Sequence, residues 1–258
     1  MTQKQLLLIW VAKFGYSTST IIQEVLGIEN KRVRNLLSEL SQTQKKGVPC
    51  IPFLKRVEVN GLQGQVLYML SEAGLAEATR ACDMDYRYSF RASEMINFDL
   101  LLHGLGVQFI CARLLAKSSE KDIFGIIPER LISSEIYEKR PDAIIFFNGQ
   151  RAAIEYERSE KSADRLDRFF QEIESSLIAQ KFDKFIIYHE VEGISKRYIN
   201  HVKNPFSRWK MRNKRWENLG KKSLDERTRG KIQIATLQEI RRATQPISFG
   251  MAKKGDMK

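Results

Sequence analysis

Residues 140–162, RPDAIIFFNGQRAAIEYERSEKS, hold two short apolar runs on either side of Asn148-Gly149. This dipeptide is the strongest two-residue signal for a β-hairpin, because both of its positions tolerate positive φ. The stretch therefore predicts two antiparallel strands in which Phe147 faces Gln150. The turn also determines which other side chains meet across the two strands.

Acidic residues flank these apolar runs. On the predicted register Asp142 lies opposite Glu155, with β-carbons about 5.5 Å apart, and Glu157 points to the same face because side chains alternate along a strand. Three carboxylates at one place would repel each other and would be desolvated by the apolar residues around them. A cation must compensate for them, or they must be protonated. Carboxylate oxygens with no nearby His or Cys favour Mg²⁺ or Mn²⁺ over zinc.

An alternative needs no metal ion. Glu155 and Glu157 could form ion pairs at the solvent end of the sheet, with Arg151, Arg158 or Lys161 as their partners. The Pro-Asp pair favours the metal site, because Pro141 fixes the backbone where the first strand begins and so places Asp142 at the start of the pairing.

Helices and strands alternate around this hairpin. We expect a buried helix over residues 100–116, a helix over 163–179, a strand over 182–189, and a strand with a helical turn over 231–240. The order strand, strand, helix, strand indicates an α/β domain.

The N-terminal part has a different pattern. Helices are expected over residues 3–13, 19–26 and 29–41, and two strands, 51–59 and 65–70, are expected before a short helix over 71–78. Hydroxyl side chains at Ser17 and Thr18 can cap the second helix, and Gly27 ends it. Three helices followed by a β-hairpin are the element order of a winged helix-turn-helix, whose third helix enters the major groove of DNA.

The exposed face predicted for this third helix suits DNA. Lys31, Arg32 and Arg34 can neutralise phosphates, Arg34 and Asn35 have the fork geometry that reads base edges, and Ser38 lies on the same face. The alternative is that the winged helix is a protein-interaction module.

The chain has 43 Lys and Arg against 31 Asp and Glu, a formal net charge of +12, which favours a polyanionic partner such as nucleic acid. Residues 196–231 carry +10 of this charge. Trp209 and Trp216 lie among the cations, and aromatic side chains beside cations suit single-strand stacking. The alternative is a solvated basic helix whose tryptophans pack on the sheet. The candidate DNA contacts here are Arg208, Lys210, Arg212, Lys214 and Arg215.

Cys50, Cys82 and Cys111 are odd in number and lack CxxC spacing, so we expect neither a disulfide framework nor a zinc site. No apolar stretch is expected to reach the roughly 20 residues of a membrane span. The prediction is a soluble, cytoplasmic protein without membrane insertion.

Pro141-Asp142, a strand, a turn and Glu155-Tyr156-Glu157 resemble the PD-(D/E)xK core of restriction-type nucleases, with Glu in place of the last Lys. Together with the winged helix, the segment LLHGLGV around His103, and Pro128-Glu129, this pattern is similar to the MobC-type plasmid mobilisation relaxases and the related replication-relaxation family. The resemblance covers roughly residues 5–190.

The residue patterns and the resemblance together predict an α/β (α+β) fold. Element order and composition indicate a winged helix-turn-helix domain at 1–82, a connector at 83–99 and a flexible tail at 245–258, and the resemblance implies that 100–244 is a restriction-endonuclease-like domain with a basic C-terminal region. It implies a relaxase that nicks one DNA strand at a plasmid transfer origin and works with accessory mobilisation and coupling proteins. Its substrate would be the double-stranded origin site, and single-stranded DNA after nicking.

The resemblance also assigns roles to residues. Asp142 and Glu155 would hold Mg²⁺ or Mn²⁺, and Glu157 would be a further ligand or the general base. Glu129 could complete the metal shell. Candidates for stabilising transition-state charge are Lys161, Arg158 and Arg165. His103 matches a family position, although a lone His in an apolar helix is also a common core residue.

Two other functions remain open from the sequence. The chain could be a non-catalytic winged-helix regulator, or a plasmid replication protein, that retains a degenerate nuclease fold. It could also be a nuclease of transposition or repair, because the chemistry does not reveal the pathway.

Overall fold

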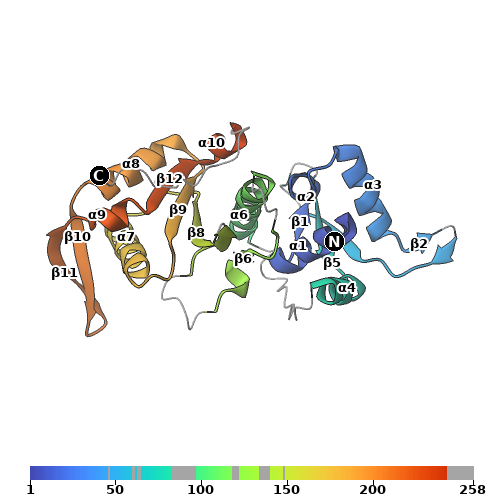
Figure 1. The fold of residues 1–258 in the computed structure, drawn as a ribbon, viewed down its shortest axis with the longest axis horizontal. Helices are drawn as coiled ribbons and strands as arrows, with labels where there is room; N and C mark the ends of the chain where they lie inside the picture. The colour runs from blue at the N-terminus through green and yellow to red at the C-terminus, as the bar shows by residue number, and fades with distance from the viewer. Residues whose placement is uncertain are drawn as a thin grey trace, which may run out of the picture.

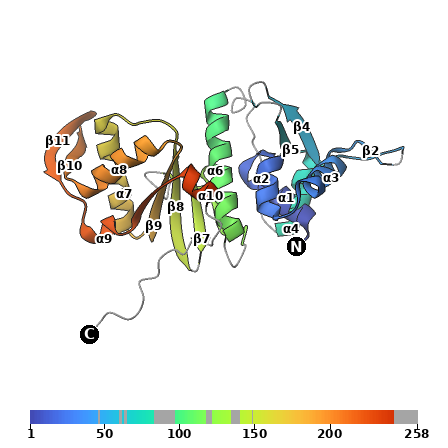
Figure 2. The same ribbon diagram turned by 90° about the horizontal axis from the view of Figure 1, so that it is seen from above.

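The chain folds as a mixed α/β protein with several sheets. Figures 1 and 2 show a helical N-terminal unit at one end and a five-stranded sheet toward the other, with helix α6 (Phe98–Lys117) standing between them. The computed structural model describes residues 1–45, 47–59, 62, 65–82, 97–117, 122–133, 140–147 and 149–242. The predicted connector at 83–99, except for its last three residues, and the predicted tail at 245–258 lie outside this range.

The N-terminal unit has the helices and the hairpin expected from the sequence. Strand β1 pairs with β5 and extends the hairpin to a three-stranded sheet of order β1-β5-β4, which was not anticipated. The elements are α1 (Gln3–Phe14), β1 (Ser17–Thr18), α2 (Ser19–Leu26), α3 (Asn30–Ser41), β4 (Leu54–Glu58), β5 (Val66–Leu70) and α4 (Glu72–Cys82). A further short hairpin, β2 (Gln44–Lys45) with β3 (Val48–Pro49), was also missed. Of the predicted loop 60–64, only Leu62 is described.

Local signals for these helices act as predicted. The Thr18 hydroxyl accepts a hydrogen bond from the Ile21 amide at 3.4 Å and so caps α2. Gly27 ends α2 with a φ of 61°, a conformation that glycine adopts without steric cost. In α3, Val33, Leu37 and Leu40 are buried against α1 and β4, which leaves the opposite face of this helix in solvent.

The central sheet has the strand order β12-β9-β8-β7-β6. Strand β7 is antiparallel to both of its neighbours, whereas β8, β9 and β12 run parallel to one another. The strands are β6 (Ile126–Pro128), β7 (Ala143–Phe147), β8 (Gln150–Glu157), β9 (Lys184–His189) and β12 (Ile232–Thr236). All of them except β6 were predicted. The register Phe147↔Gln150 and Ala143↔Ile154 is the predicted one, although Asn148 itself lies outside the described residues.

Helices cover both faces of this sheet. Apolar residues of α7 (Ala163–Ile178) and α8 (Glu192–Lys203) pack on one face, and those of α6 and α10 (Leu237–Arg242) pack on the other. The sequence predicted α6, α7 and the turn of α10, but not α8. Short helices η1 (Glu129–Leu131) and α9 (Glu226–Arg229) follow β6 and precede β12.

The basic segment is a β-hairpin, so the alternative of a basic helix at Trp209 and Trp216 is wrong. Strands β10 (Phe206–Arg212) and β11 (Arg215–Lys222) pair antiparallel and lie beside α7 at the end of the molecule farthest from the N-terminal unit (Figure 1). The turn consists of Asn213 and Lys214, with φ values of 48° and 62°. This is the sign of φ that a two-residue hairpin turn of type I′ requires.

One apolar cluster joins the N-terminal unit to the sheet. Trp10 and Phe14 of α1 belong to the same cluster as Ile110 of α6 and Ile154 of β8. Lys13 reinforces this contact, because its buried ammonium donates hydrogen bonds to carbonyl oxygens in the segment that leads into β6. The two parts of the chain therefore share a core along α6.

Helix α6 also corrects an expectation about membranes. Its residues 98–116 are long and apolar enough to cross a bilayer by length and composition, with a mean hydropathy of 1.4. In the fold this helix packs between the sheet and the N-terminal unit, and Ile110, Cys111 and Ala112 are fully buried. Helix α6 is therefore a core helix of this fold, which is compatible with a soluble protein.

Candidate active site

Asp142 lies directly before β7, with its carboxylate at the end of the strand. One carboxylate oxygen accepts a hydrogen bond from the backbone amide of Tyr156 on β8 at 2.7 Å. The other lies 3.1 Å from His103 Nε2. The backbone carbonyl of Asp142 accepts a hydrogen bond from the Glu129 amide at 2.8 Å, which ties η1 to the same place. Asp142 is therefore held between two strands and α6.

Glu155 and Glu157 occupy alternate positions of β8 and are only 6% and 7% exposed. They are in register with Ile187 and His189 of the parallel neighbour β9, on the sheet face that α7 and α8 cover. Glu157 forms an ion pair with Lys161. Burial of two carboxylates at the end of one strand is costly unless cations or hydrogen-bond donors compensate.

The ion-pair alternative is observed for Lys161. Lys161 pairs with Glu157, whereas Arg158 approaches Asp99 at 3.6 Å and Glu190 at 3.4 Å. The Arg151 guanidinium donates to the carbonyl oxygen of Gln180 at 2.7 Å.

His103 is the second basic side chain that faces the carboxylates. Burial disfavours its charged form, but the hydrogen bond and the charge of Asp142, together with the charges of Glu155 and Glu157, outweigh burial and raise the pKa of His103 above its usual 6.5. The imidazole ring stacks on Tyr156, with the ring centroids 5.5 Å apart. His103 therefore lies beside the carboxylates, with its imidazole hydrogen-bonded to Asp142.

Two glycines explain how α6 brings His103 so close. A β-carbon at Gly104 would lie 2.2 Å from the Tyr16 hydroxyl oxygen, and one at Gly106 would lie 2.1 Å from the Tyr156 ring. Both distances are far below van der Waals contact. The segment LLHGLGV therefore allows α6 to touch the N-terminal unit and the sheet at once.

Two hollows meet at His103. One, of about 350 Å³, is lined by Asp142, Glu129 and Arg140 among others. The second, of about 470 Å³, is lined by Glu155, Glu157 and Lys161 among others. His103 and Leu100 line both hollows, so α6 forms the ridge between them.

The predicted ligands come to one end of the β7–β8 hairpin, but their carboxylates are not gathered around one point. Among the residues that the structure describes, no group of three or more His, Cys, Asp or Glu side chains is arranged to hold a metal ion. Asp142 turns to His103, and Glu157 turns to Lys161. Glu129 lines the hollow that contains Asp142, where its carboxylate lies 3.6 Å from the Arg140 guanidinium.

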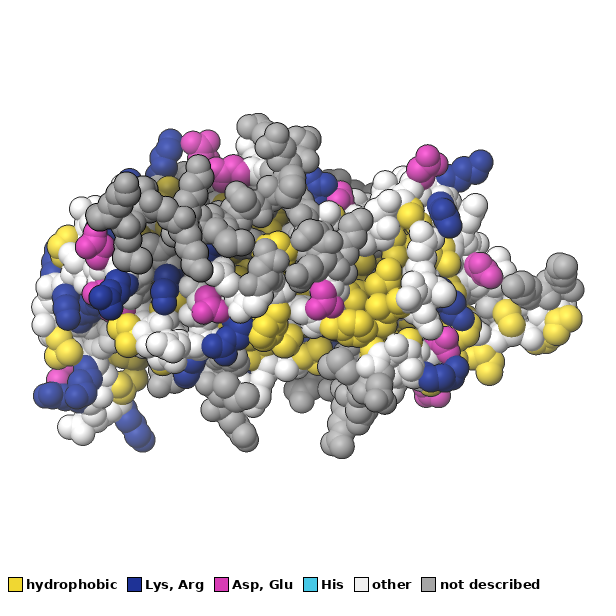
Figure 3. Space-filling model, viewed as in Figure 1, with side chains coloured by type: hydrophobic (Ala, Val, Ile, Leu, Met, Phe, Trp, Pro, Cys, Tyr) yellow, Lys and Arg dark blue, Asp and Glu magenta, His cyan; other side chains and the backbone are white. Residues whose placement is uncertain are grey.

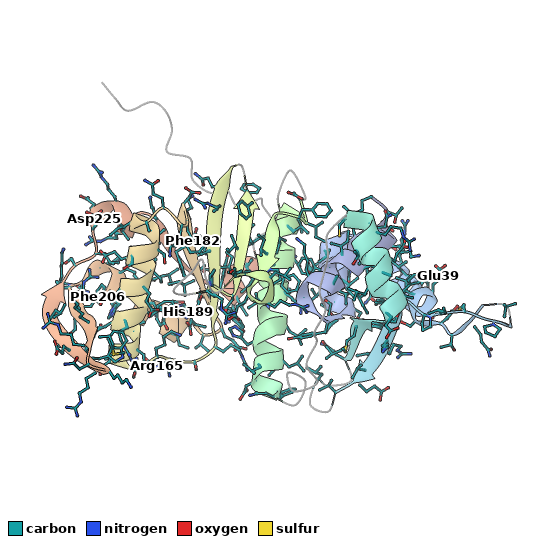
Figure 4. All side chains as sticks on the ribbon, turned by 90° about the horizontal axis from the view of Figure 1, so that it is seen from below. Glu39, Arg165, Phe182, His189, Phe206 and Asp225 are labelled. Carbon is teal, nitrogen blue, oxygen red and sulfur yellow. The ribbon has the colours of Figure 1, made fainter. Side chains whose placement is uncertain are left out.

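The sequence did not reveal His189 as a neighbour of the carboxylates. The expectation that no His lies near them, which favoured Mg²⁺ or Mn²⁺ over zinc, is wrong. His189 ends β9 in register with Glu157 and is fully buried, with its ring centroid 4.3 Å from that of Tyr198. Burial, helped by the charge of Lys161, lowers the pKa of His189 to about 4, so its ring is neutral at neutral pH. Figure 4 shows His189 in the interior of the sheet unit.

The predicted DNA contacts of α3 form an exposed face. None of these side chains is buried against the rest of the described structure. They are Lys31, Arg32, Arg34, Asn35 and Ser38.

Four of the five basic candidates on the β10–β11 hairpin are exposed. Lys and Arg side chains gather over this end of the molecule in Figure 3. The exposed residues are Lys210, Arg212, Lys214 and Arg215. Arg208 differs, because it is partly buried in an ion pair with Glu174 and donates to the Ser223 carbonyl oxygen at 2.9 Å. Its role is to fasten the hairpin to α7.

Comparisons of the chain with protein-family models, with curated proteins and with solved structures found no match. The features that bear on function are therefore the fold and the side chains of Asp142, Glu155, Glu157, His103 and Lys161.

Proposed function

We propose that this protein is a divalent-metal-dependent DNA endonuclease that nicks one strand at a plasmid transfer origin, that is, a mobilisation relaxase. The observation that carries the proposal is that Asp142, at the start of β7, and the buried pair Glu155 and Glu157 on β8 lie at the same end of the hairpin, beside the basic side chains of His103 and Lys161. Two buried carboxylates at the end of one strand are unfavourable for stability, so they are candidates for function.

The element order supports a PD-(D/E)xK-like core. The Pro-Asp pair precedes β7, the Glu-Tyr-Glu sequence ends the adjacent strand β8, and α7 then leads to the parallel strand β9. The Lys of the pattern is absent, but Lys161 reaches the same carboxylates from four residues beyond Glu157.

The oxygen donors of Asp142 and Glu155 suit Mg²⁺ or Mn²⁺, with Glu157 or Glu129 as further ligands. When bound, such an ion would polarise the phosphodiester and activate water. Binding would require His103 and Lys161 to turn away from the carboxylates. Both line the hollow beside the carboxylates, where positive charge on either side chain would stabilise the transition state of a phosphate that enters it.

Proton transfer has its own candidates in the site. Glu157 is placed to accept a proton from the attacking oxygen, and His103, with its raised pKa, is placed to hold a proton for the leaving oxygen. Arg158 and Arg165 remain candidates for contact with flanking phosphates.

Duplex recognition is assigned to the N-terminal unit. Its element order, with β1 between α1 and α2 and a hairpin after α3, supports a winged helix whose exposed α3 face meets the major groove.

Substituting Arg34 or Asn35 should reduce sequence preference. Neutralising Lys210, Arg212 and Lys214 should instead weaken binding to all sequences and flatten the salt dependence. Equal effects from both sets, measured as binding to specific and random duplexes over a salt series, would contradict this division.

The test of nicking uses supercoiled plasmid that carries the gene's own flanking DNA, incubated with Mg²⁺ or Mn²⁺ and then with chelator. We expect metal-dependent conversion to open circles, which Asp142→Asn and Glu155→Gln abolish. Glu192→Gln removes an exposed carboxylate on α8 and should leave nicking intact. Tight binding without nicking in any metal would overturn the proposal.

A non-catalytic DNA-binding regulator, or a plasmid replication protein, is the second candidate. The ion pairs of Asp142 with His103 and of Glu157 with Lys161 favour it, because they neutralise the cluster without a metal. A nuclease of transposition or repair would use the same chemistry. Adjacent coupling-protein genes would favour conjugation, and with it accessory mobilisation proteins as cytoplasmic partners, whereas transposase genes would favour the third candidate.

A further inference from the structure

A cationic groove runs along α7 next to the carboxylate hollow. It has a volume of about 270 Å³ and is lined by Lys161, Arg165, Arg168, Phe169 and Glu172. Lys161 also lines the hollow that contains Glu155 and Glu157. The groove and the candidate active site are therefore neighbours that share a wall.

Two cations of this groove lie on one face of α7. Arg165 and Arg168 are three residues apart, which is about one helical turn, roughly 5.4 Å, and Lys161 lies just before the helix begins. Arg165 is exposed and lies at the end of α7 near the hairpin (Figure 4). Within the described parts of the chain, neither Arg165 nor Arg168 forms an ion pair with an acidic side chain.

The far end of the groove is an aromatic surface. The Arg168 guanidinium lies over the Trp216 ring of β11, 4.6 Å from its centroid, and Trp216 is 43% exposed. Met211, directly across the hairpin from Trp216, is also exposed. A flat ring held by a stacked guanidinium offers one face to a nucleobase and a charge to its phosphate.

The two tryptophans have different roles. Trp209 is partly buried, its indole nitrogen lies 3.3 Å from Asp167, and its backbone exchanges hydrogen bonds of 2.7 and 2.8 Å with the Gln171 side chain. It anchors the hairpin to α7. Trp216 makes no such hydrogen bond among the described residues and stays accessible, which leaves it available to a ligand.

Three cationic side chains lie close together at the tip of the β10–β11 hairpin. Arg212 and Arg215 face each other across the strands, where like charges destabilise a hairpin, and the ion pair of Arg212 with Glu217 at 3.4 Å offsets part of this repulsion. Lys214 adds a third cation with a φ of 62°, a backbone conformation that costs a non-glycine residue about 1–2 kcal/mol. A polyanion along this surface would relieve the repulsion.

We propose that the groove of Lys161, Arg165 and Arg168, continued by Trp216 and the tip cations, binds single-stranded DNA that leads away from the candidate active site. This inference rests on the proposed nicking function, because that function defines the point from which the bound strand leads away. Stacking on Trp216 requires a base that is free of its duplex neighbours, which selects an unpaired strand over a duplex. The exposed face of α3, by contrast, has no aromatic side chain and would hold the duplex.

The test measures binding of a fluorescent oligothymidine by fluorescence anisotropy. The probe has about 16 nucleotides, the upper size of a single-strand site. Chelator is present so that metal-dependent cleavage does not occur. Trp216→Ala should weaken binding about 5- to 100-fold, and Trp216→Phe should recover part of the loss. Arg165→Gln should lower the slope of binding against salt by about 0.7. Lys196→Gln removes an exposed cation of α8 and serves as the matched control with no change.

Four outcomes separate the proposals. Equal oligothymidine binding by wild type, Trp216→Ala and Trp216→Phe, all folded by circular dichroism, would overturn the single-strand groove even if plasmid nicking persists. Equal losses in duplex and single-strand binding by Trp216→Ala would overturn its preference for an unpaired strand. Loss of single-strand binding in the Trp216 variants, without nicking by wild type in any metal, would leave the groove standing and remove the nuclease. Loss of single-strand binding in the Trp216 variants, together with metal-dependent nicking by wild type, would support both proposals.

Discussion

Lys13 provides the sharpest test of the shared core along α6. It is 1% exposed, and its ammonium donates to the carbonyl oxygens of Ile126 at 2.7 Å, Ile123 at 2.8 Å and Phe124 at 3.2 Å. Lys13→Met keeps the length of the side chain but leaves the two buried carbonyls, those of Ile123 and Ile126, without this donor. A buried acceptor without a partner costs about 1–3 kcal/mol. We therefore expect the free energy of unfolding to fall by about 2–6 kcal/mol.

The loss should depend on pH in a defined direction. Burial lowers the pKa of Lys13 from its usual 10.5 to about 8. Between these two values the unfolded chain binds more protons than the folded chain, so the contribution of Lys13 to stability rises with pH. The rise is limited to about 3 kcal/mol, at about 1.36 kcal/mol per pKa unit. Below pH 8 the lysine is charged in both states and its contribution is constant.

The assay is urea unfolding of wild type and Lys13→Met at pH 7, 8, 9 and 10. Other groups that titrate in this range and do not contact Lys13 are present in both proteins and largely cancel in the difference. The difference in unfolding free energy should grow from pH 8 to pH 10. Parallel pH profiles, or a variant as stable as wild type, would refute the account of Lys13 as a buried link between α1 and the sheet unit.

Two further predictions concern α6. Gly106→Ala should destabilise the fold by about 1–3 kcal/mol, because its β-carbon would lie 2.1 Å from the Tyr156 ring. Gly193→Ala, in a helix with open space around it, should instead stabilise by about 0.5–1 kcal/mol; thermal unfolding compares the two, and a harmless Gly106→Ala would contradict the close packing. Asp142→Asn should lower the pKa of His103, because the hydrogen bond and charge that raise it are weakened while burial remains. NMR titration of the imidazole reports this directly, and an unchanged midpoint would mean that Asp142 does not hold the proton on His103.

The parts of the site that could be predicted are those encoded locally. Asn148-Gly149 sets the register of β7 and β8, so the approach of Asp142 and Glu155 to the same hairpin end follows from a short stretch of chain. Helix α3 and its exposed cations follow in the same way from the spacing of Val33, Leu37 and Leu40.

The parts that could not be predicted depend on long-range packing. His103 reaches Asp142 only because α6 lies against Tyr16 and Tyr156, and two glycines do not reveal from the sequence which rings will approach them. His189 reaches Glu157 through parallel pairing of β8 with β9, which no local signal specifies. The sequence also missed the hairpin β10–β11, because its turn uses Asn213-Lys214 where the common signal would be Asn-Gly.

The ion pairs explain why the carboxylates do not form a ready cage. The prediction treated a metal ion as the cation that compensates three acidic side chains, but His103 and Lys161 can do so as well. Whether these cations are displaced by a metal ion is the point on which the proposed chemistry depends.

The most direct measurement is a titration of Mn²⁺ followed by electron paramagnetic resonance, which reports metal binding without any need for the correct DNA. The account predicts one specific site in wild type that Asp142→Asn and Glu155→Gln each weaken by more than the roughly 10- to 100-fold typical of losing an outer-shell partner, with no change in Glu192→Gln. Equal Mn²⁺ binding by all four proteins, or none by wild type, would contradict the claim that these carboxylates form a metal site.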